Sequence, residues 1–133
     1  MKEQQSSAIA LRVGAARQNI TCTLAGVGML GYGKAGNVVA GVLSPQYARA
    51  FVVSAPEGTV AYVCADICFV TDALKVAVMA QLAVALPEVF DYDNVMLAAQ
   101  HTHSGAGGYG QHFFTICLSR VLCRRCLRNM LRA

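Results

Sequence analysis

The order of hydrophobic and polar positions along the chain predicts several strands and one helix. In residues 9–13, large apolar residues alternate with small or charged ones, which is the period of a strand. Residues 46–54 are rich in aromatic and β-branched residues, and residues 60–65 are almost continuously apolar, as in a central strand covered on both faces. Because the turn residues of segment 55–59 separate these two runs, we expect them to form a β-hairpin.

A long apolar segment after the hairpin predicts a mostly buried helix. Thr71 or Asp72 can cap its N-terminus, only two polar residues interrupt residues 73–86, and Pro87 ends it. The apolar run 94–99 suits another buried strand. A strand, a helix and a strand of these lengths form a β-α-β unit with parallel strands. The predicted fold class is α/β, with a mixed β-sheet that contains a β-hairpin and a β-α-β unit.

A glycine-rich segment, residues 26–41, predicts a long ordered loop, because so many glycines exclude a helix. Its residues 26–31 match the dinucleotide pattern G-x-G-x-x-G, and residues 28–34 nearly match a P-loop. Both patterns require a helix that this segment does not predict. The first also lacks an acid about 20 residues later, and the second has Ala35 where a hydroxyl should bind magnesium. No nucleotide ligand is expected.

Two histidines follow the last predicted strand. His101 and His103 begin a loop at the carboxyl end of the sheet, the edge where α/β proteins build their sites. Asp66 ends the preceding parallel strand, so it should share this edge and could orient metal ligands. Ser104 can hydrogen-bond a ligand, and Gly105 lets the backbone approach one. These residues leave two interpretations open, a metal site that suits zinc or a polar turn.

Composition and charge restrict the class of protein. The 133 residues suit one domain, and with 56% apolar and 14% charged residues the chain is expected to belong to a larger protein or assembly. The net charge of +4 comes from five arginines in the last fourteen residues, while residues 1–119 contain six basic and seven acidic groups. The sequence therefore indicates no nucleic-acid partner. It shows no secretory signal and no apolar run long enough to span a bilayer, so the compartment is left undetermined.

The cysteines do not predict a separate metal site. Cys22, Cys64 and Cys68 lie in apolar surroundings and are expected to be buried free thiols. Cys123 and Cys126 form a single C-x-x-C pair, and a structural zinc site would need a second pair of ligands.

The segment HTHSGAGGYGQ, together with GVGMLGYGKAGNVVAGV, YARAFVV, VCADI and DNVMLAAQHTHSG, resembles the N-terminal part of the neutral (non-lysosomal) ceramidases. The likeness covers residues 8 to about 115, and Ala106 replaces the usual proline. It implies a hydrolase of sphingolipid metabolism that cleaves the linear amide bond of ceramide, giving sphingosine and a fatty acid. It also implies Zn²⁺, held by two histidines, a glutamate and a tyrosine.

The resemblance assigns roles to residues of the histidine motif. His101 corresponds to a zinc ligand, the one ligand of the family's four that this chain contains. His103 corresponds to a residue of the substrate pocket, where it would bind the head group or stabilise the oxyanion, with Ser104 and Gly105 beside it. Ceramide is the implied partner.

The end of the chain departs from the family. Residues 1–115 are interpreted as the N-terminal part of a larger catalytic domain, and residues 116–133 as a divergent, basic Cys/Arg-rich tail. The tail could form a basic amphipathic helix that contacts a membrane surface, although an out-of-frame translation product is the preferred interpretation. We expect a truncated fragment that is inactive alone. The alternatives are a non-catalytic interaction module and a truncated gene product without function.

Overall fold

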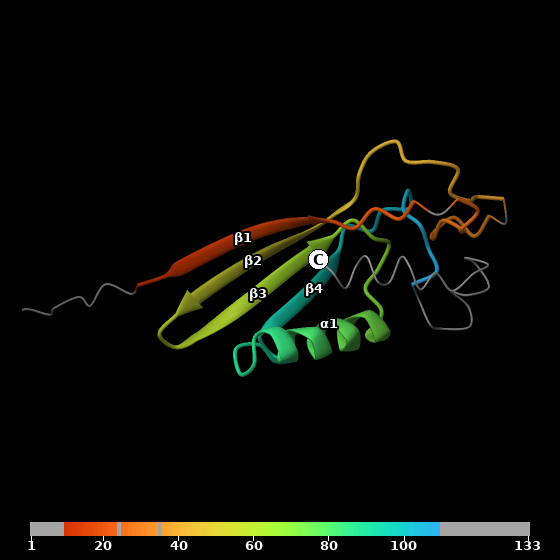
Figure 1. Ribbon diagram of the computed structural model, residues 1–133. Coiled ribbons are helices and arrows are strands. Elements are labelled where there is room, and N and C mark those ends of the chain that lie inside the picture. The colour runs from red at the N-terminus through yellow and green to blue at the C-terminus, as the bar shows by residue number, and fades with distance from the viewer. Residues whose placement is uncertain (1–9, 24, 35, 110–133) are drawn as a thin grey trace, which may run out of the picture.

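The computed structural model describes residues 10–23, 25–34 and 36–109 and contains one sheet and one helix (Figure 1). The elements are β1 (Arg12–Asn19), β2 (Tyr47–Ala55), β3 (Gly58–Ala65), α1 (Asp72–Ala85) and β4 (Val95–Ala99). The sheet order is β1-β2-β3-β4, with antiparallel pairs β1–β2 and β2–β3 and a parallel pair β3–β4. The predicted mixed sheet, hairpin and β-α-β unit are confirmed.

The first strand lies further along the chain than its apolar alternation predicts. It begins at Arg12, opposite Ser54, and continues to Asn19, opposite Tyr47. All its residues are exposed, so no buried face imposes a hydrophobic period on them. Backbone pairing with β2 decides its extent, and within the predicted range 9–13 the strand contains Arg12 and Val13.

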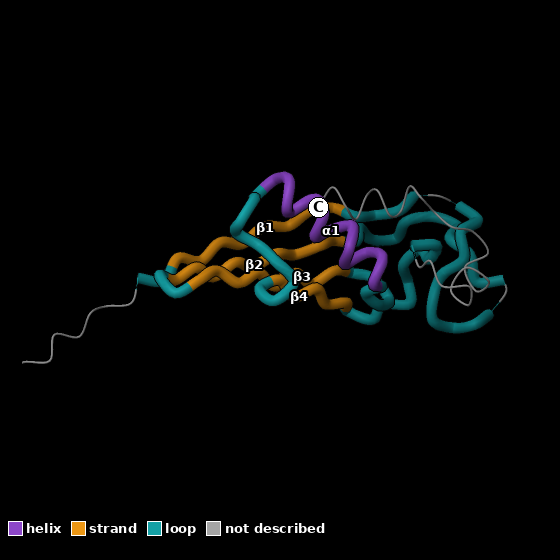
Figure 2. Tube along the Cα trace, turned by 90° about the horizontal axis from the view of Figure 1, so that it is seen from below, coloured by secondary structure: helices purple, strands orange, loops and turns teal. Residues whose placement is uncertain are grey.

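The helix forms where its sequence signals predict it. Thr71 is the N-cap, and its Oγ1 accepts a hydrogen bond from the Leu74 amide at 3.2 Å. The helix covers one face of the sheet (Figure 2). Leu74 and Met79 are buried, but Val76 and Val84 remain 56% and 84% exposed, so the prediction of a mostly buried helix is wrong. The reason is that the described residues cover this helix on one side only.

The hydrophobic core lies on the same side of the sheet. One cluster joins residues of the loops and of α1: Ile20, Leu30, Ile67, Cys68, Leu74 and Tyr109. A second joins Ala61, Met79 and Val95 beneath the helix. On the opposite face of β3, Val60 and Tyr62 are 56% and 41% exposed, so this strand is not covered on both faces as predicted. A cavity of about 500 Å³ lies between the sheet and α1. No helix among the described residues is long and apolar enough to cross a membrane.

The glycine-rich segment is an ordered loop, as predicted. Gly28 and Val38 form an antiparallel bridge, which folds the segment back on itself. A second bridge joins Met29 to Ala106, and the Gly107 amide donates to the Gly28 carbonyl at 2.8 Å. These contacts place the loop against the segment that follows the two histidines.

Two of the three cysteines expected to be free are free thiols. Cys68 is buried and Cys64 is half-buried, whereas Cys22 is buried and disulfide-bonded, so the expectation is wrong for Cys22. The predicted boundary at residue 115 and the tail 116–133 lie outside the described residues.

Candidate metal centre

The candidate site lies at the carboxyl edge of β3 and β4. The Gln100 amide donates to the Ala65 carbonyl at 2.9 Å, and the Thr102 amide donates to the Ile67 carbonyl at 3.2 Å. The parallel pairing of the two strands therefore continues into the loops that follow them. Figure 2 shows the long loops gathered at one end of the sheet, away from the turn between β2 and β3. The sequence-based placement of both loops at one edge is correct.

His101 is exposed at this edge, and its ring is oriented by the backbone. Its Nδ1 lies 2.8 Å from the Cys68 carbonyl oxygen. Because a carbonyl can only accept, Nδ1 carries the proton and donates, which leaves the lone pair of the neutral ring on Nε2. His101 also has a φ of 59°, a left-handed conformation that costs of order 1–3 kcal/mol for a non-glycine residue. The hydrogen bond thus holds the ring, and Nε2 is left free to bind a ligand.

His103 is half-buried and lies between aromatic neighbours. Its ring centroid is 4.9 Å from that of His101, with an angle of 69° between the planes, and 4.9 Å from that of Tyr32. Gly31 also lies against this ring, because an added Cβ at that position would overlap it. The glycine-rich loop thus makes room for a histidine more than 70 residues later.

Cys68 completes a group of ligand atoms with the two histidines. One ligand atom each of Cys68, His101 and His103 lie within 4.8 Å of one another. Cys68 is 5% exposed, and burial raises the pKa of its thiol. The sequence-based interpretation did not include Cys68 in this group. The signal was its position two residues after Asp66, at a strand end already assigned to this edge.

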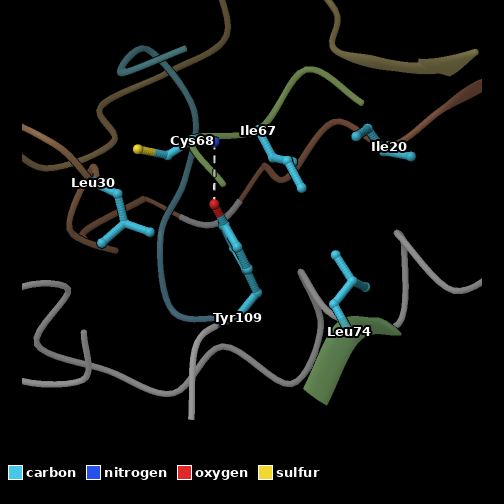
Figure 3. Packing of buried hydrophobic residues seen from close by; sticks show 6 residues of the cluster. All are labelled: Ile20, Leu30, Ile67, Cys68, Leu74 and Tyr109. Carbon is cyan, nitrogen blue, oxygen red and sulfur yellow. Dashed lines mark hydrogen bonds between the residues drawn. The ribbon is translucent and has the colours of Figure 1, made fainter. Parts of the chain in front are cut away.

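Tyr109 supports the segment that carries Cys68. Its hydroxyl oxygen accepts hydrogen bonds from the backbone amides of Cys68 at 3.1 Å and Phe69 at 3.3 Å. Figure 3 shows this hydroxyl directed at the Cys68 backbone from within the core cluster. Burial raises the pKa of Tyr109 to about 12, so the hydroxyl stays neutral at physiological pH. Tyr109 therefore holds the loop that contains Cys68, whose carbonyl oxygen accepts the hydrogen bond from His101.

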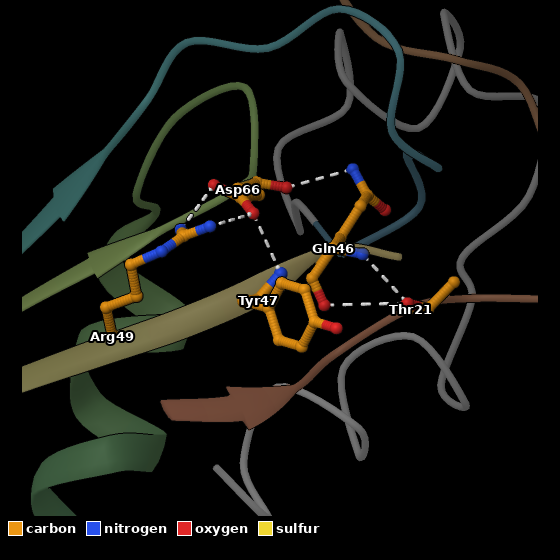
Figure 4. Close-up of polar contacts among 5 residues, drawn as sticks. All are labelled: Thr21, Gln46, Tyr47, Arg49 and Asp66. Carbon is orange, nitrogen blue, oxygen red and sulfur yellow. Dashed lines mark hydrogen bonds and ion pairs between the residues drawn. The ribbon is translucent and has the colours of Figure 1, made fainter. Parts of the chain in front are cut away.

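Asp66 lies at the predicted edge, where it anchors β2. Its carboxylate accepts two hydrogen bonds from Arg49, at 2.7 and 3.1 Å, and one from the Tyr47 amide at 2.9 Å (Figure 4). Burial alone would raise the pKa of Asp66, but the hydrogen bonds and the charge of Arg49 bring it below its ordinary value. Among the described residues, the group of clustered ligand atoms does not include Asp66.

Ser104 and Gly105 continue the loop beyond the histidines. The Ser104 amide donates to Thr102 Oγ1 at 3.2 Å, and its exposed side chain faces solvent. A Cβ at Gly105 would overlap the Gln46 side chain, whose Nε2 donates to the Asp66 carbonyl at 3.0 Å. Glycine at position 105 therefore lets the histidine loop pack against Gln46, the residue before β2.

The donor set limits which ions the site can hold. Imidazole nitrogen and thiolate sulfur suit zinc, copper and related ions, whereas magnesium and calcium prefer oxygen ligands. The exposed position of His101 leaves access for an external ligand. The arrangement thus fits a borderline-soft divalent ion such as Zn²⁺.

Sequence comparisons place the chain among ceramidases. The neutral/alkaline non-lysosomal ceramidase N-terminal model matches residues 11–124. Neutral ceramidase of Pseudomonas aeruginosa is 41% identical over 103 residues, which are 76% of this chain and 15% of that protein. Neutral ceramidase A of Dictyostelium discoideum is 35% identical over 76% of this chain and 14% of its own length. The chain thus spans about 15% of the length of the relatives it matches.

Structural comparison agrees with this result. The crystal structure of neutral ceramidase from Pseudomonas aeruginosa superposes with a TM-score of 0.83 and 32% identity, over 93% of this chain and 21% of that chain. A structure described as ceramidase complexed with C2 also gives a TM-score of 0.83. The fold is therefore a partial piece of a larger protein, as the sequence predicts. From the matched sequence and the shared fold together, this chain belongs to the neutral/alkaline non-lysosomal ceramidase family.

Proposed function

We propose that this chain provides part of the active site of a zinc-dependent amidohydrolase that cleaves the N-acyl bond of ceramide. The observation that carries this proposal is the cluster of Cys68, His101 and His103 at the carboxyl edge of β3 and β4, in a chain of the ceramidase family. The products are sphingosine and a fatty acid.

His101 is the proposed zinc ligand. Donation from its Nδ1 to the Cys68 carbonyl presents Nε2 to the metal and holds the ring in one orientation. When bound, Zn²⁺ supplies Lewis acidity, which polarises the substrate carbonyl and lowers the pKa of a coordinated water. The exposed position of His101 allows a large lipid substrate to reach this centre.

His103 is the proposed catalytic residue that contacts the substrate amide. Its ring is held by Tyr32 on one side and by the Gly31 backbone on another. A ring fixed in this way can donate a hydrogen bond to the oxygen on which negative charge develops. Ser104, which is exposed, and the backbone at Gly105 are proposed to bind the polar head group of ceramide.

The isolated chain is expected to be inactive towards ceramide. The resemblance assigns four zinc ligands to the family, and His101 is the one that this chain supplies. Catalytic zinc sites normally use three protein ligands, so His101 alone would hold the ion weakly.

A ceramide-hydrolysis assay, with zinc titration, tests this function. It compares the 133-residue chain with a longer chain that also contains the remaining regions of a neutral ceramidase. We expect the extended chain to hydrolyse ceramide and its His101→Ala variant to lose activity, whereas Val76→Ala, at an exposed residue of α1, should retain it. Full activity of His101→Ala would contradict the zinc assignment.

A second candidate function is non-catalytic binding to a full-length ceramidase. Val13 on β1 and Val84 on α1 are 72% and 84% exposed, and isolated apolar faces of this kind favour a protein partner. Co-purification of the two proteins that persists in His101→Ala would support this function. Co-purification that fails with the unaltered chain would exclude it.

A further inference from the structure

We infer that Cys68 is a second metal ligand of this chain and binds through its sulfur beside His101. The inference rests on the proposed zinc site and deepens it. The family's implied ligands are histidine, glutamate and tyrosine, so a sulfur ligand would give this chain a coordination chemistry of its own.

The positions of the ligand atoms support this assignment. The Cys68 sulfur, one ring nitrogen of His101 and one ring nitrogen of His103 lie within 4.8 Å of one another. In a tetrahedral zinc site with ordinary bond lengths, sulfur and nitrogen ligands are separated by about 3.5 Å. Because 4.8 Å is the upper limit of these separations, the ligand atoms have to approach one another by at most about 1.3 Å.

Cys68 contributes to the site through its backbone as well. Its carbonyl accepts from His101 Nδ1, and its amide donates to the Tyr109 hydroxyl. Orientation of a metal-ligating histidine by a backbone carbonyl is a common feature of metal centres. Here the residue that orients one ligand also carries the next ligand atom, so the two are held in a fixed relation.

The thiol is chemically available for this role. Cys68 is a free cysteine, and it is 5% exposed, so access to its sulfur is restricted to small reagents and ions. The other free thiol among the described residues, Cys64, lies on β3 and does not belong to the group of clustered ligand atoms. Cys64 is therefore a matched control for Cys68.

Cobalt titration of the 133-residue chain tests the inference by spectroscopy. Co²⁺ replaces Zn²⁺ in such sites, and a thiolate ligand adds a sulfur-to-cobalt charge-transfer band. We expect Cys68→Ser to remove this band, and Cys64→Ser and a Cys123→Ser/Cys126→Ser variant to retain it. Zn²⁺ affinity of Cys68→Ser should fall by more than about 100-fold, since even the loss of a partner outside the ligand shell costs roughly 10–100-fold.

The outcomes separate this inference from the proposed function. If Cys68→Ser and Cys64→Ser give bands of equal intensity, Cys68 is not a ligand. If the chain binds cobalt without a charge-transfer band and loses binding in His101→Ala, the zinc site stands and the sulfur ligand is overturned. If the chain binds no metal, the sulfur ligand is overturned, whereas the proposed function is decided by the ceramide assay on the longer chain.

A second measurement uses the unaltered chain, so its result does not depend on whether Cys68→Ser folds. Alkylation of Cys68 and Cys64 is followed by peptide mass spectrometry with and without Zn²⁺. Bound zinc should slow alkylation of Cys68 several-fold and leave Cys64 unchanged. Equal rates at Cys68 with and without zinc, at saturating metal, would overturn the inference.

Discussion

Single side chains decide how the edge of the sheet is held together. Asp66 joins the end of β3 to β2 through Arg49 and the Tyr47 amide. Tyr109 joins the histidine loop to the segment that carries Cys68. Each contact links parts of the chain that are at least 17 residues apart. These contacts therefore fix the positions of separate segments relative to one another at the site.

Replacement of Asp66 by asparagine is expected to lower stability at neutral pH and to change its pH dependence. The pKa of Asp66 is below its ordinary value of 3.8, so the ionised form is favoured in the folded state. Its contribution is fully present well above pH 3.8 and is lost as the pH falls through the lower, folded pKa. Thermal melts between pH 7 and pH 2 should therefore show a difference between the two proteins that shrinks with acidification. A difference in melting temperature that stays constant between pH 7 and pH 2 would show that ionised Asp66 does not stabilise the fold.

Tyr109→Phe is expected to destabilise the chain by about 1–3 kcal/mol, because two backbone amides lose their shared acceptor in a buried place. Urea unfolding measures the change. Tyr92→Phe is the control, since Tyr92 is 58% exposed and its ring contact with Lys75 does not need the hydroxyl. Equal stability of Tyr109→Phe and the unaltered chain would show that these hydrogen bonds contribute nothing.

The loops do more than connect the strands and the helix. The glycine-rich segment pairs with itself through Gly28 and Val38 and with the histidine loop through Met29 and Ala106. It thereby borders the candidate site on the side of the histidine loop. The strand ends border the site as well, since β3 and β4 end side by side at Ala65 and Ala99.

Gly31→Ala is expected to displace the His103 ring, because the new Cβ would overlap it and the backbone φ of +113° disfavours alanine. We expect altered NMR signals of the His103 ring and weaker zinc binding. Gly33→Ala shares the positive φ but has open space, and Gly36→Ala has open space and no positive φ. If Gly33→Ala perturbs His103 as strongly as Gly31→Ala, backbone strain rather than overlap with the ring is responsible.

The described part of the molecule is a sheet with one covered face. Large apolar side chains remain exposed on β1, on α1 and on the outer face of β3. The match to 21% of the Pseudomonas structure indicates that other regions of a ceramidase belong around such a piece.

Zinc is expected to raise the melting temperature of the chain, because a ligand that binds only the folded state stabilises it by about 2.7 kcal/mol at 100 times its Kd. Differential scanning fluorimetry with Zn²⁺ and with a chelator measures the shift, which the chelator should reverse. His101→Ala should show a smaller shift. An identical shift in that variant would place the stabilising metal elsewhere.

Local sequence signals were sufficient for the elements and for the edge that carries the histidines. The cap at Thr71, the turn before Gly58 and the apolar runs act over a few residues, so they can be recognised without coordinates. The order of a strand, a helix and a parallel strand then places Asp66 and His101 at one end of the sheet.

Contacts between distant segments could be identified only from the tertiary structure. The pairing of Asp66 with Arg49, the fit of Gly31 to His103 and the inclusion of Cys68 in the metal centre leave no periodic pattern in the sequence. The extent of β1 is a further example, since backbone hydrogen bonds to β2 set it and its exposed side chains do not. Hydrophobic periodicity reports burial along one element, whereas the assembly of a site depends on side chains that meet only after the elements have packed.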